Sequence, residues 1–232
     1  MRLMRNIVLA IAALSMATLS WADNAGLAVK TRLQNTGHVL NAIMAAPDKG
    51  IPDAVLQQAQ CIAIVPTLMK GGFIFGGEGG PGVASCRTAQ GWSAPAFFTV
   101  AGGSWGLQIG LEDVNLVMVF LNDKGMERLM SSKFQMGAGA SAAAGPIGRQ
   151  ASADTNWKLN TEILTYSRAK GVFAGVTLHG AVIRRDAPDM DAIYGPNATT
   201  RSVLTGRVTT PAIANPFIHA IRHAEHQAKM SE

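Results

Sequence analysis

Apolar side chains recur at helical spacing in the segment 23–46. They are Leu27, Leu33, Leu40, Ile43 and Met44. This spacing predicts a helix, which Pro47 and Gly50 end. Pro52 then starts a second, shorter helix that runs to Gln60. Both helices are expected to pack on a sheet; the alternative for the first is an amphipathic helix that lies on a membrane surface.

Short β-like runs replace the helical spacing from Cys61 onward, and Pro66 ends the first of them. The predicted strands are 61–65, 83–87, 96–100, 105–110, 114–121 and 134–144, and then a hairpin of 162–170 and 172–185 about Gly171. Because most connections are too short for crossover helices, the sheet should be mainly antiparallel. The many glycines predict bends and bulges, and therefore a strongly bent sheet or partial barrel.

Further helical segments follow the strands. Short helices are predicted over 123–131, 189–194 and 199–204, and Asn215-Pro216 opens a terminal helix over 215–229. The expected fold is therefore α+β, a bent and mainly antiparallel sheet with N-terminal helices over 23–60 and a C-terminal helix packed around it. Since no linker interrupts the pattern, residues 23–232 are expected to form one domain with its core at 60–195.

The N-terminal segment has the pattern of a secretory signal. Arg2 and Arg5 precede a short apolar run, and Ser20 and Ala22 place small residues at a cleavage site. We expect cleavage after Ala22; the alternative is a retained anchor, although the run is short for a bilayer span of about 20 residues. An exported protein of the periplasm or cell envelope is predicted.

The net charge is mildly basic. The chain carries +5, and removal of Arg2 and Arg5 with residues 1–22 leaves +3. Such an excess suits weak attraction to anionic surfaces and gives no reason to expect nucleic acid as a partner. Since no later stretch reaches bilayer length, the mature protein should be soluble or peripheral to the membrane.

Cys61 and Cys86 are the two cysteines of the chain. In an oxidising compartment a pair of cysteines favours a disulfide, which would stabilise the fold by about 3 kcal/mol. Two buried thiols are the alternative. The pair lacks the spacing of a zinc site.

Two glycine-rich motifs match the letters of functional signatures without their context. Residues 77–82 fit a dinucleotide fingerprint, and residues 102–106 place Ser104 as in a nucleophile elbow. Both signatures need a helix after the motif, whereas β-like residues follow here. A tight glycine turn at 77–82 and a bend between strands at 102–106 are predicted instead, with no cofactor and no catalysis.

His219, His223 and His226 share one face of the predicted terminal helix. Spacings of four and three residues bring imidazoles near one another, so a peripheral metal ion could bind there. The alternative, which we favour, is a polar solvated face.

Several cations lie within segments that are rich in small residues. The candidates for contact with phosphate are Lys70, Arg87, Lys133, Arg149, Arg168 and Lys170. Lys70 precedes Gly71-Gly72 and Arg149 follows Gly148, and glycine-flanked cations can pair exposed backbone N–H groups with a positive charge. Ordinary surface charges are the alternative.

A set of motifs in one order resembles the SYLF domain, a lipid-binding domain family. The motifs are Ile64-Val65-Pro66, Lys70–Gly77, Gly91–Phe98, Trp105–Gly110, Ala144–Arg149 and Tyr166–Gly171. They extend over about 60–195, and the preceding helix fits the same domain pattern.

The resemblance implies affinity for anionic lipids, which are phosphoinositides for eukaryotic members, and some of those members also bind actin filaments. An exported protein would not meet cytosolic actin. The expected function is therefore non-catalytic binding of anionic phospholipids or membrane surfaces. The alternative is a structural or protein-interaction component of the envelope without lipid affinity.

Overall fold

The computed structural model describes most of the chain after the N-terminal segment. The described residues are 26–45, 50–72, 75–105, 110–137, 142–146, 161–169, 172–175 and 180–230. The predicted signal peptide, 1–22, lies outside them, as do the candidate residues Arg149 and Lys170.

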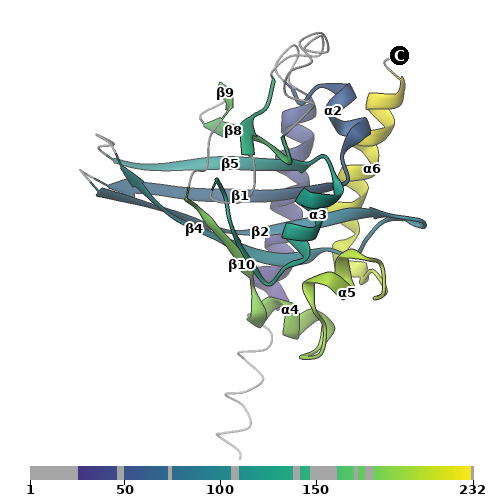
Figure 1. Cartoon of the computed structure of the whole chain (residues 1–232). Helices are drawn as coiled ribbons and strands as arrows, with labels where there is room; N and C mark the ends of the chain where they lie inside the picture. The colour runs from purple at the N-terminus through teal and green to yellow at the C-terminus, as the bar shows by residue number, and fades with distance from the viewer. Residues whose placement is uncertain are drawn as a thin grey trace, which may run out of the picture.

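The strands form one strongly curled sheet (Figure 1). They are β1 Cys61–Gly72, β2 Phe75–Thr88, β3 Gly91–Trp92, β4 Ala96–Trp105, β5 Gly110–Phe120, β6 Lys133–Gln135, β7 Ala142–Ala144, β8 Ile163–Ala169, β9 Val172–Gly175 and β10 Val182–Arg185. Their order is β6-β10-β4-β2-β1-β5-β8-β7, with β3 on β2 and β9 on β8. All described pairings are antiparallel except that of β7 with β8. The predicted bent, mainly antiparallel sheet is confirmed as a half-barrel.

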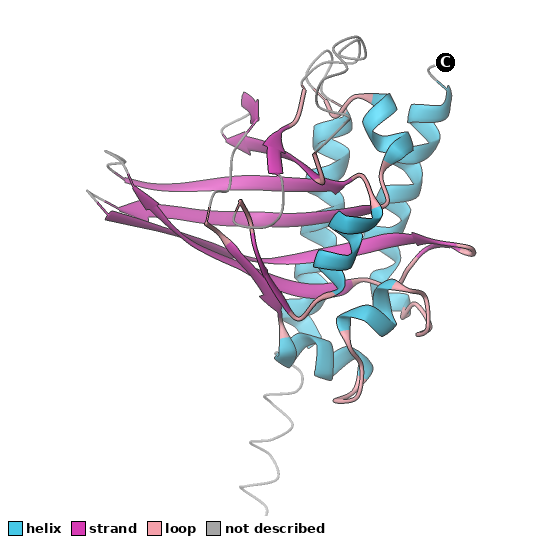
Figure 2. Ribbon diagram, in the orientation of Figure 1, coloured by secondary structure: helices cyan, strands magenta, loops and turns pink. Residues whose placement is uncertain are grey.

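Helices cover both faces of the sheet at one end. The N-terminal helix spans 26–44, and the others are α2 Asp53–Gln58, α3 Asp123–Met130, α4 Ala187–Tyr194, α5 Thr200–Leu204 and α6 Asn215–Met230. The N-terminal helix and α6 run side by side behind the sheet, and α3 and α5 lie in front of it (Figures 1 and 2). The predicted α+β class and the helices at both ends of the chain are confirmed.

The N-terminal helix packs on the sheet through its apolar face. Leu33, Leu40 and Ile43 are fully buried, whereas Leu27 is 62% exposed and lies off that face. Arg32 fixes the helix to the start of α4, because its guanidinium pairs with Asp186 at 2.9 Å and with Asp189 at 2.7 Å. The packing interpretation of this helix is therefore confirmed.

Alternate residues of β4 face the two helical layers. The Phe97 ring lies beneath the Arg32 guanidinium, 5.8 Å from it, and 6.4 Å from the Tyr194 ring. Phe98, the next residue, lines a small cavity with Leu129 of α3 and Leu204 of α5. This alternation is the period of two that a strand imposes on its side chains, and it explains why consecutive residues are both buried.

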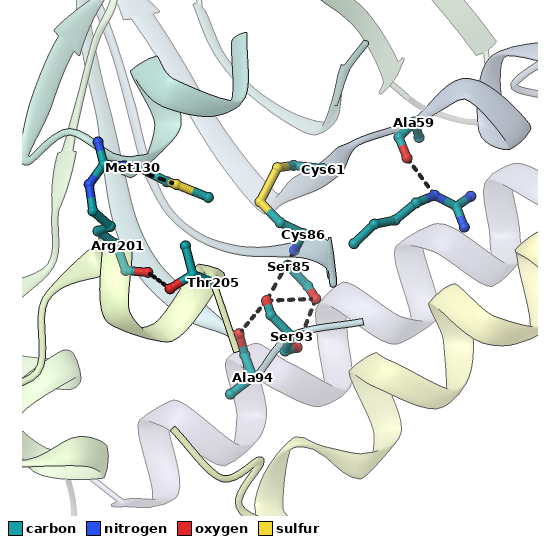
Figure 3. The surroundings of a disulfide bond; sticks show 10 residues. Ala59, Cys61, Ser85, Cys86, Ser93, Ala94, Met130, Arg201 and Thr205 are labelled. Carbon is teal, nitrogen blue, oxygen red and sulfur yellow. Dashed lines mark hydrogen bonds between the residues drawn. A yellow bond between two sulfur atoms is a disulfide. The ribbon is translucent and has the colours of Figure 1, made fainter. Parts of the chain in front are cut away.

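The disulfide between Cys61 and Cys86 is confirmed. The two residues are direct cross-strand partners in β1 and β2, with Cα atoms 3.9 Å apart. Beside it, the Ser85 hydroxyl donates to the Ser93 carbonyl at 2.8 Å, and the Ser93 hydroxyl accepts from the Cys86 amide at 3.1 Å (Figure 3). These bonds satisfy buried polar groups at the point where β3 turns back onto β2.

Three local predictions were wrong because strand pairing overrides turn-forming composition. Residues 77–82 form no tight turn: they continue β2 and pair with Phe98–Gly103 of β4. Ser104 lies in β4 rather than at a bend, since β4 runs on to Trp105. Pro66 does not end β1: the register shifts between Val65 and Leu68, and the Asn115 amide donates to the Pro66 carbonyl at 2.5 Å. A bulge therefore accommodates the residue that cannot donate.

Two predicted late strands are each divided. The segment 134–144 contains β6, which pairs with β10, and β7, which pairs with β8 on the other side of the sheet. The segment 172–185 contains β9, which forms the predicted hairpin with β8, and β10, which pairs with β4. Local periodicity identifies β-structure in these segments but carries no information on the partner of each strand.

Candidate functional site

The candidate cation Lys70 is held in an ion pair. Its ammonium group lies 3.3 Å from the Glu78 carboxylate, and the two side chains are 16% and 8% exposed. They project from neighbouring strands, because Lys70 and Glu78 are cross-strand partners in β1 and β2. The charge of Lys70 is thus largely balanced within the protein.

Arg87 joins three elements. Its guanidinium donates to the carbonyls of Ala59 at 2.6 Å and Leu56 at 3.1 Å, at the end of α2, and to Glu225 of α6 at 2.5 Å. It also lies over the Trp92 ring, 4.8 Å from its centroid. These contacts give Arg87 a structural role in holding α2 and α6 against β2.

The Glu225 carboxylate accepts hydrogen bonds from three side chains. Besides Arg87, the Trp92 indole donates at 2.9 Å and the Lys229 ammonium at 2.9 Å. Burial by itself would raise the pKa of Glu225, but the bonds from Arg87, Lys229 and Trp92 together outweigh it and lower the pKa to about 2. This carboxylate therefore remains ionised and fully engaged at neutral pH.

The remaining described candidates lie on two other strands. Lys133 is exposed on β6, at one edge, and Arg168 is half-buried on β8, with five strands between β6 and β8 in the sheet order. The four described candidates therefore occupy four strands and do not form one cluster. Their role in lipid binding stays a prediction.

The three histidines of α6 are all exposed, but they do not converge. Within the described ranges, no three metal-ligating side chains are grouped to hold an ion. His219 and His223 line a groove beside the N-terminal helix, and His226 is not part of its lining.

A polar groove of about 360 Å³ lies on the opposite flank of α6. Its lining comes from the β2–β3 turn, the loop after α5, and α6: Thr88, Gln90, Trp92, Ser93, Ala94, Gly206, Arg207, Val208, Thr209, Thr210 and Arg222. We call it the Arg207–Arg222 groove. The β2–β3 turn is far in sequence from the loop after α5 and from α6, so the groove exists only in the folded chain.

Two glycines with positive φ shape the segments that line the Arg207–Arg222 groove. Gly91, at φ 110°, closes the turn from β2 to β3, where the Thr88 hydroxyl donates to the Gly91 carbonyl at 2.8 Å. Gly206, at φ 75°, ends α5 and directs the loop across the Thr88 side chain. A Cβ at Gly206 would lie 3.2 Å from the Thr88 methyl group, so the two segments touch. Both positions favour glycine because other residues rarely adopt positive φ.

The groove carries two unbalanced positive charges. Arg207 and Arg222 are exposed, and among the described residues no carboxylate forms an ion pair with either guanidinium. Glu225, one helical turn from Arg222, is already bound by Arg87 and Lys229. Guanidinium groups beside threonine hydroxyls and a glutamine amide form a donor set that suits phosphate.

Sequence reasoning did not find this groove. Neither Arg207 nor Arg222 is among the candidate cations predicted from the sequence. The available signal was weak: Arg207 lies between a glycine and Val208-Thr209-Thr210, a loop with many donors. Only the packing of this loop against Thr88 and α6 brings the two arginines to one groove.

The described helices give no sign of a membrane span. None of those in the described ranges is both long enough and apolar enough to cross a bilayer.

Comparison with known proteins shows the family of the chain. The sequence model of the Ysc84 family, described as "Las17-binding protein actin regulator", matches residues 101–224. The chain belongs to the Ysc84 family. The resemblance drawn from the SYLF motifs is thereby confirmed, and both arginines of the groove lie inside the matched segment.

Individual Ysc84 relatives match over most of this chain. Protein YSC84 of Saccharomyces cerevisiae is 35% identical over 179 residues, which are 75% of this chain and 38% of that protein. LAS seventeen-binding protein 3 of the same organism is 34% identical over 75% of this chain and 39% of its own length. SH3 domain-containing YSC84-like protein 1 of Homo sapiens is 31% identical over 72% of this chain and 49% of its own length. The chain thus spans between about two fifths and one half of these relatives.

Proposed function

We propose that this protein is a non-catalytic, exported envelope component that binds anionic phospholipid headgroups in the Arg207–Arg222 groove. The observation that carries the proposal is the pair of arginines without carboxylate partners among the described residues, in a groove rich in hydrogen-bond donors. Export rests on the signal pattern of residues 1–22.

The chemistry of the groove supports binding over catalysis. Its described lining contains no histidine and no carboxylate, the usual general bases of enzymes. The serine in it, Ser93, is buried and bonded to the backbone of Cys86 and Ala94. The groove therefore offers positive charge and donors but no activated nucleophile.

Co-sedimentation with vesicles tests the proposal. The protein should pellet with vesicles that contain phosphatidylglycerol, and less with pure phosphatidylcholine vesicles. Because the attraction is between charges at a surface, binding should weaken as salt is raised from about 50 to 300 mM, since salt shortens the distance over which charges attract. Equal pelleting with both vesicles would contradict charge-driven binding.

A double variant locates the site. Arg207→Gln with Arg222→Gln should weaken binding by about 2 kcal/mol, roughly thirtyfold, at about 1 kcal/mol per basic residue near an anionic surface. The matched control is the pair Lys30→Gln and Lys124→Gln, two exposed cations on the N-terminal helix and α3 whose substitution removes the same charge elsewhere. If both pairs of substitutions weaken binding equally, net charge and not the groove is responsible.

A protein-interaction role is the second candidate. It is favoured by the family description, which names a protein, Las17, as a binding partner. This role predicts no affinity for either kind of vesicle, together with a partner from the envelope that binds the wild-type protein and can be reconstituted with it from purified components.

A further inference from the structure

α6 separates two grooves of different chemistry. Arg222 faces the groove described above, and on the other flank a second groove of about 380 Å³ lies between α6 and the N-terminal helix. Its lining is Asn41, Met44, Ala45, His219, His223 and Gln227. We call it the His219–His223 groove. The two grooves share no lining residue, so they can be altered separately.

Close contact of two helices forms the His219–His223 groove. Gly37 of the N-terminal helix packs on the start of α6, where a Cβ at this position would lie 3.1 Å from the Pro216 carbonyl oxygen and 3.7 Å from the Ala220 Cβ. From this contact both helices run in the same direction, side by side (Figure 1). The last turn of the N-terminal helix, with Asn41, therefore faces the middle of α6.

His219 and His223 lie one helical turn apart on the exposed flank of α6. A separation of four residues puts two side chains on one face of a helix, about 6 Å apart at Cβ. Helical zinc sites use this same separation for a pair of histidine ligands. Among the described residues, no hydrogen bond or ion pair engages either imidazole, so ring nitrogens remain available in this groove.

We propose that His219 and His223 bind a divalent transition metal ion as a two-imidazole chelate. The side-chain oxygen of Asn41 provides a further polar ligand atom at the same groove, and water fills the other coordination positions. Imidazole nitrogens favour copper, nickel and zinc over magnesium and calcium, and the order of affinity is Cu²⁺ above Ni²⁺ and Zn²⁺. The proposal uses two histidines, since the third, His226, does not line the groove.

Titration of the full chain with metal salts tests this site. Isothermal titration calorimetry with Zn²⁺, Ni²⁺ and Cu²⁺ should each show one site, with Cu²⁺ bound most tightly, and Mg²⁺ should show none. His219→Ala and His223→Ala should each weaken Zn²⁺ binding at least tenfold, because one of two strong ligands is lost. Absence of Zn²⁺ and Ni²⁺ binding, or equal binding of Mg²⁺, would overturn the proposal.

His226→Ala is the matched control, because His226 is also exposed on α6 and lies three residues after His223. It should change Zn²⁺ affinity less than twofold. His38→Ala removes an exposed histidine from the neighbouring helix and should act likewise. If His226→Ala weakens binding as much as His223→Ala, the ion is held by loose surface histidines and the assigned pair is wrong. Vesicle binding of all four variants should equal that of the wild type, which separates this test from that of the proposed function.

Discussion

The four long strands, β1, β2, β4 and β5, have two unlike halves. In the half covered by helices, Ile62–Val65 of β1 and Val117–Phe120 of β5 are buried on both faces. In the other half, which Figure 1 shows reaching beyond the helices, Met69 is 55% exposed, and β2 and β4 consist largely of glycine and small residues. The backbone pairing nevertheless continues through both halves.

This difference separates two contributions to one sheet. Burial of apolar side chains stabilises the covered half, at about 25 cal/mol per Å² of area removed from water. The glycine-rich half has little such area to bury, so it depends on backbone hydrogen bonds, each with a net value of about 1 kcal/mol. Stability should therefore be concentrated at the helix-covered end, and substitutions of similar size should have very different effects in the two halves.

The largest effect is expected from truncation of a core side chain in the covered half. Phe97→Ala should lower the free energy of unfolding by about 3–5 kcal/mol, because a fully buried ring beneath Arg32 is replaced by a cavity. Met69→Ala in the glycine-rich half should change it by less than about 0.5 kcal/mol. Urea unfolding followed by tryptophan fluorescence measures both. Similar losses for the two variants would mean that the exposed half is stabilised by side-chain burial after all.

Two glycines of β2, Gly80 and Gly77, test where the covered half ends and the glycine-rich half begins. A Cβ at Gly80 would lie 2.3 Å from the Thr67 carbonyl oxygen and 2.9 Å from a Val65 methyl group, so Gly80→Ala should destabilise by about 1–3 kcal/mol. At Gly77 the nearest atom, the Gly102 carbonyl oxygen, is 3.8 Å away. Gly77→Ala should therefore stabilise by about 0.4–1 kcal/mol, through loss of freedom in the unfolded chain. Thermal unfolding of both variants would reveal opposite shifts; shifts of the same sign would contradict the steric explanation.

A smaller effect is expected from the carboxylate that ties the helices to the covered half. The folded-state pKa of Glu225 is lowered to about 2 from 4.5, so its contribution to stability is present above pH 4.5 and is lost as the pH falls toward 2. Glu225→Gln should destabilise by about 1 kcal/mol at pH 7, since solvent screens part of the interaction. The stabilities of variant and wild type should converge near pH 2.

Unfolding by guanidinium chloride at several pH values across this range measures these differences in stability. Glu127→Gln is the comparison variant, because Glu127 pairs with Arg201 at the exposed surface. It should lose less stability at pH 7 than Glu225→Gln does. If the free energies of unfolding of Glu225→Gln and wild type differ by a constant amount down to pH 2, the loss comes from the shape of the amide and not from its missing charge.

The elements of this fold were largely predictable from sequence, but their partners were not. Helical spacing located the N-terminal helix, α3 and α6 to within a few residues, because their buried faces leave a periodic pattern. Glycine content misled at 77–82, where the sheet requires close approach of backbones and not a turn. Strand composition could not assign partners to β6 and β7, since both are short segments of 3 residues that pair at opposite edges of the sheet.

The candidate site was beyond sequence reasoning for a related reason. Lys70 and Arg87 were identified by their neighbours in the chain, yet Glu78 and Glu225 balance their charges in the fold. Arg207 and Arg222 belong to different elements, and only the turn at Gly206 brings them to one groove. Local sequence reports which residues carry charge, whereas the fold decides which charges remain available to a ligand.

The position of the disulfide has a consequence for damage to the chain. Cys61 begins β1 and Cys86 lies near the end of β2, so the whole hairpin of 62–85 is enclosed in one covalent ring. Cleavage of a peptide bond within the ring opens it but does not release a fragment. The two pieces would migrate as one species until a reductant separates them, and the core would keep both of its central strands.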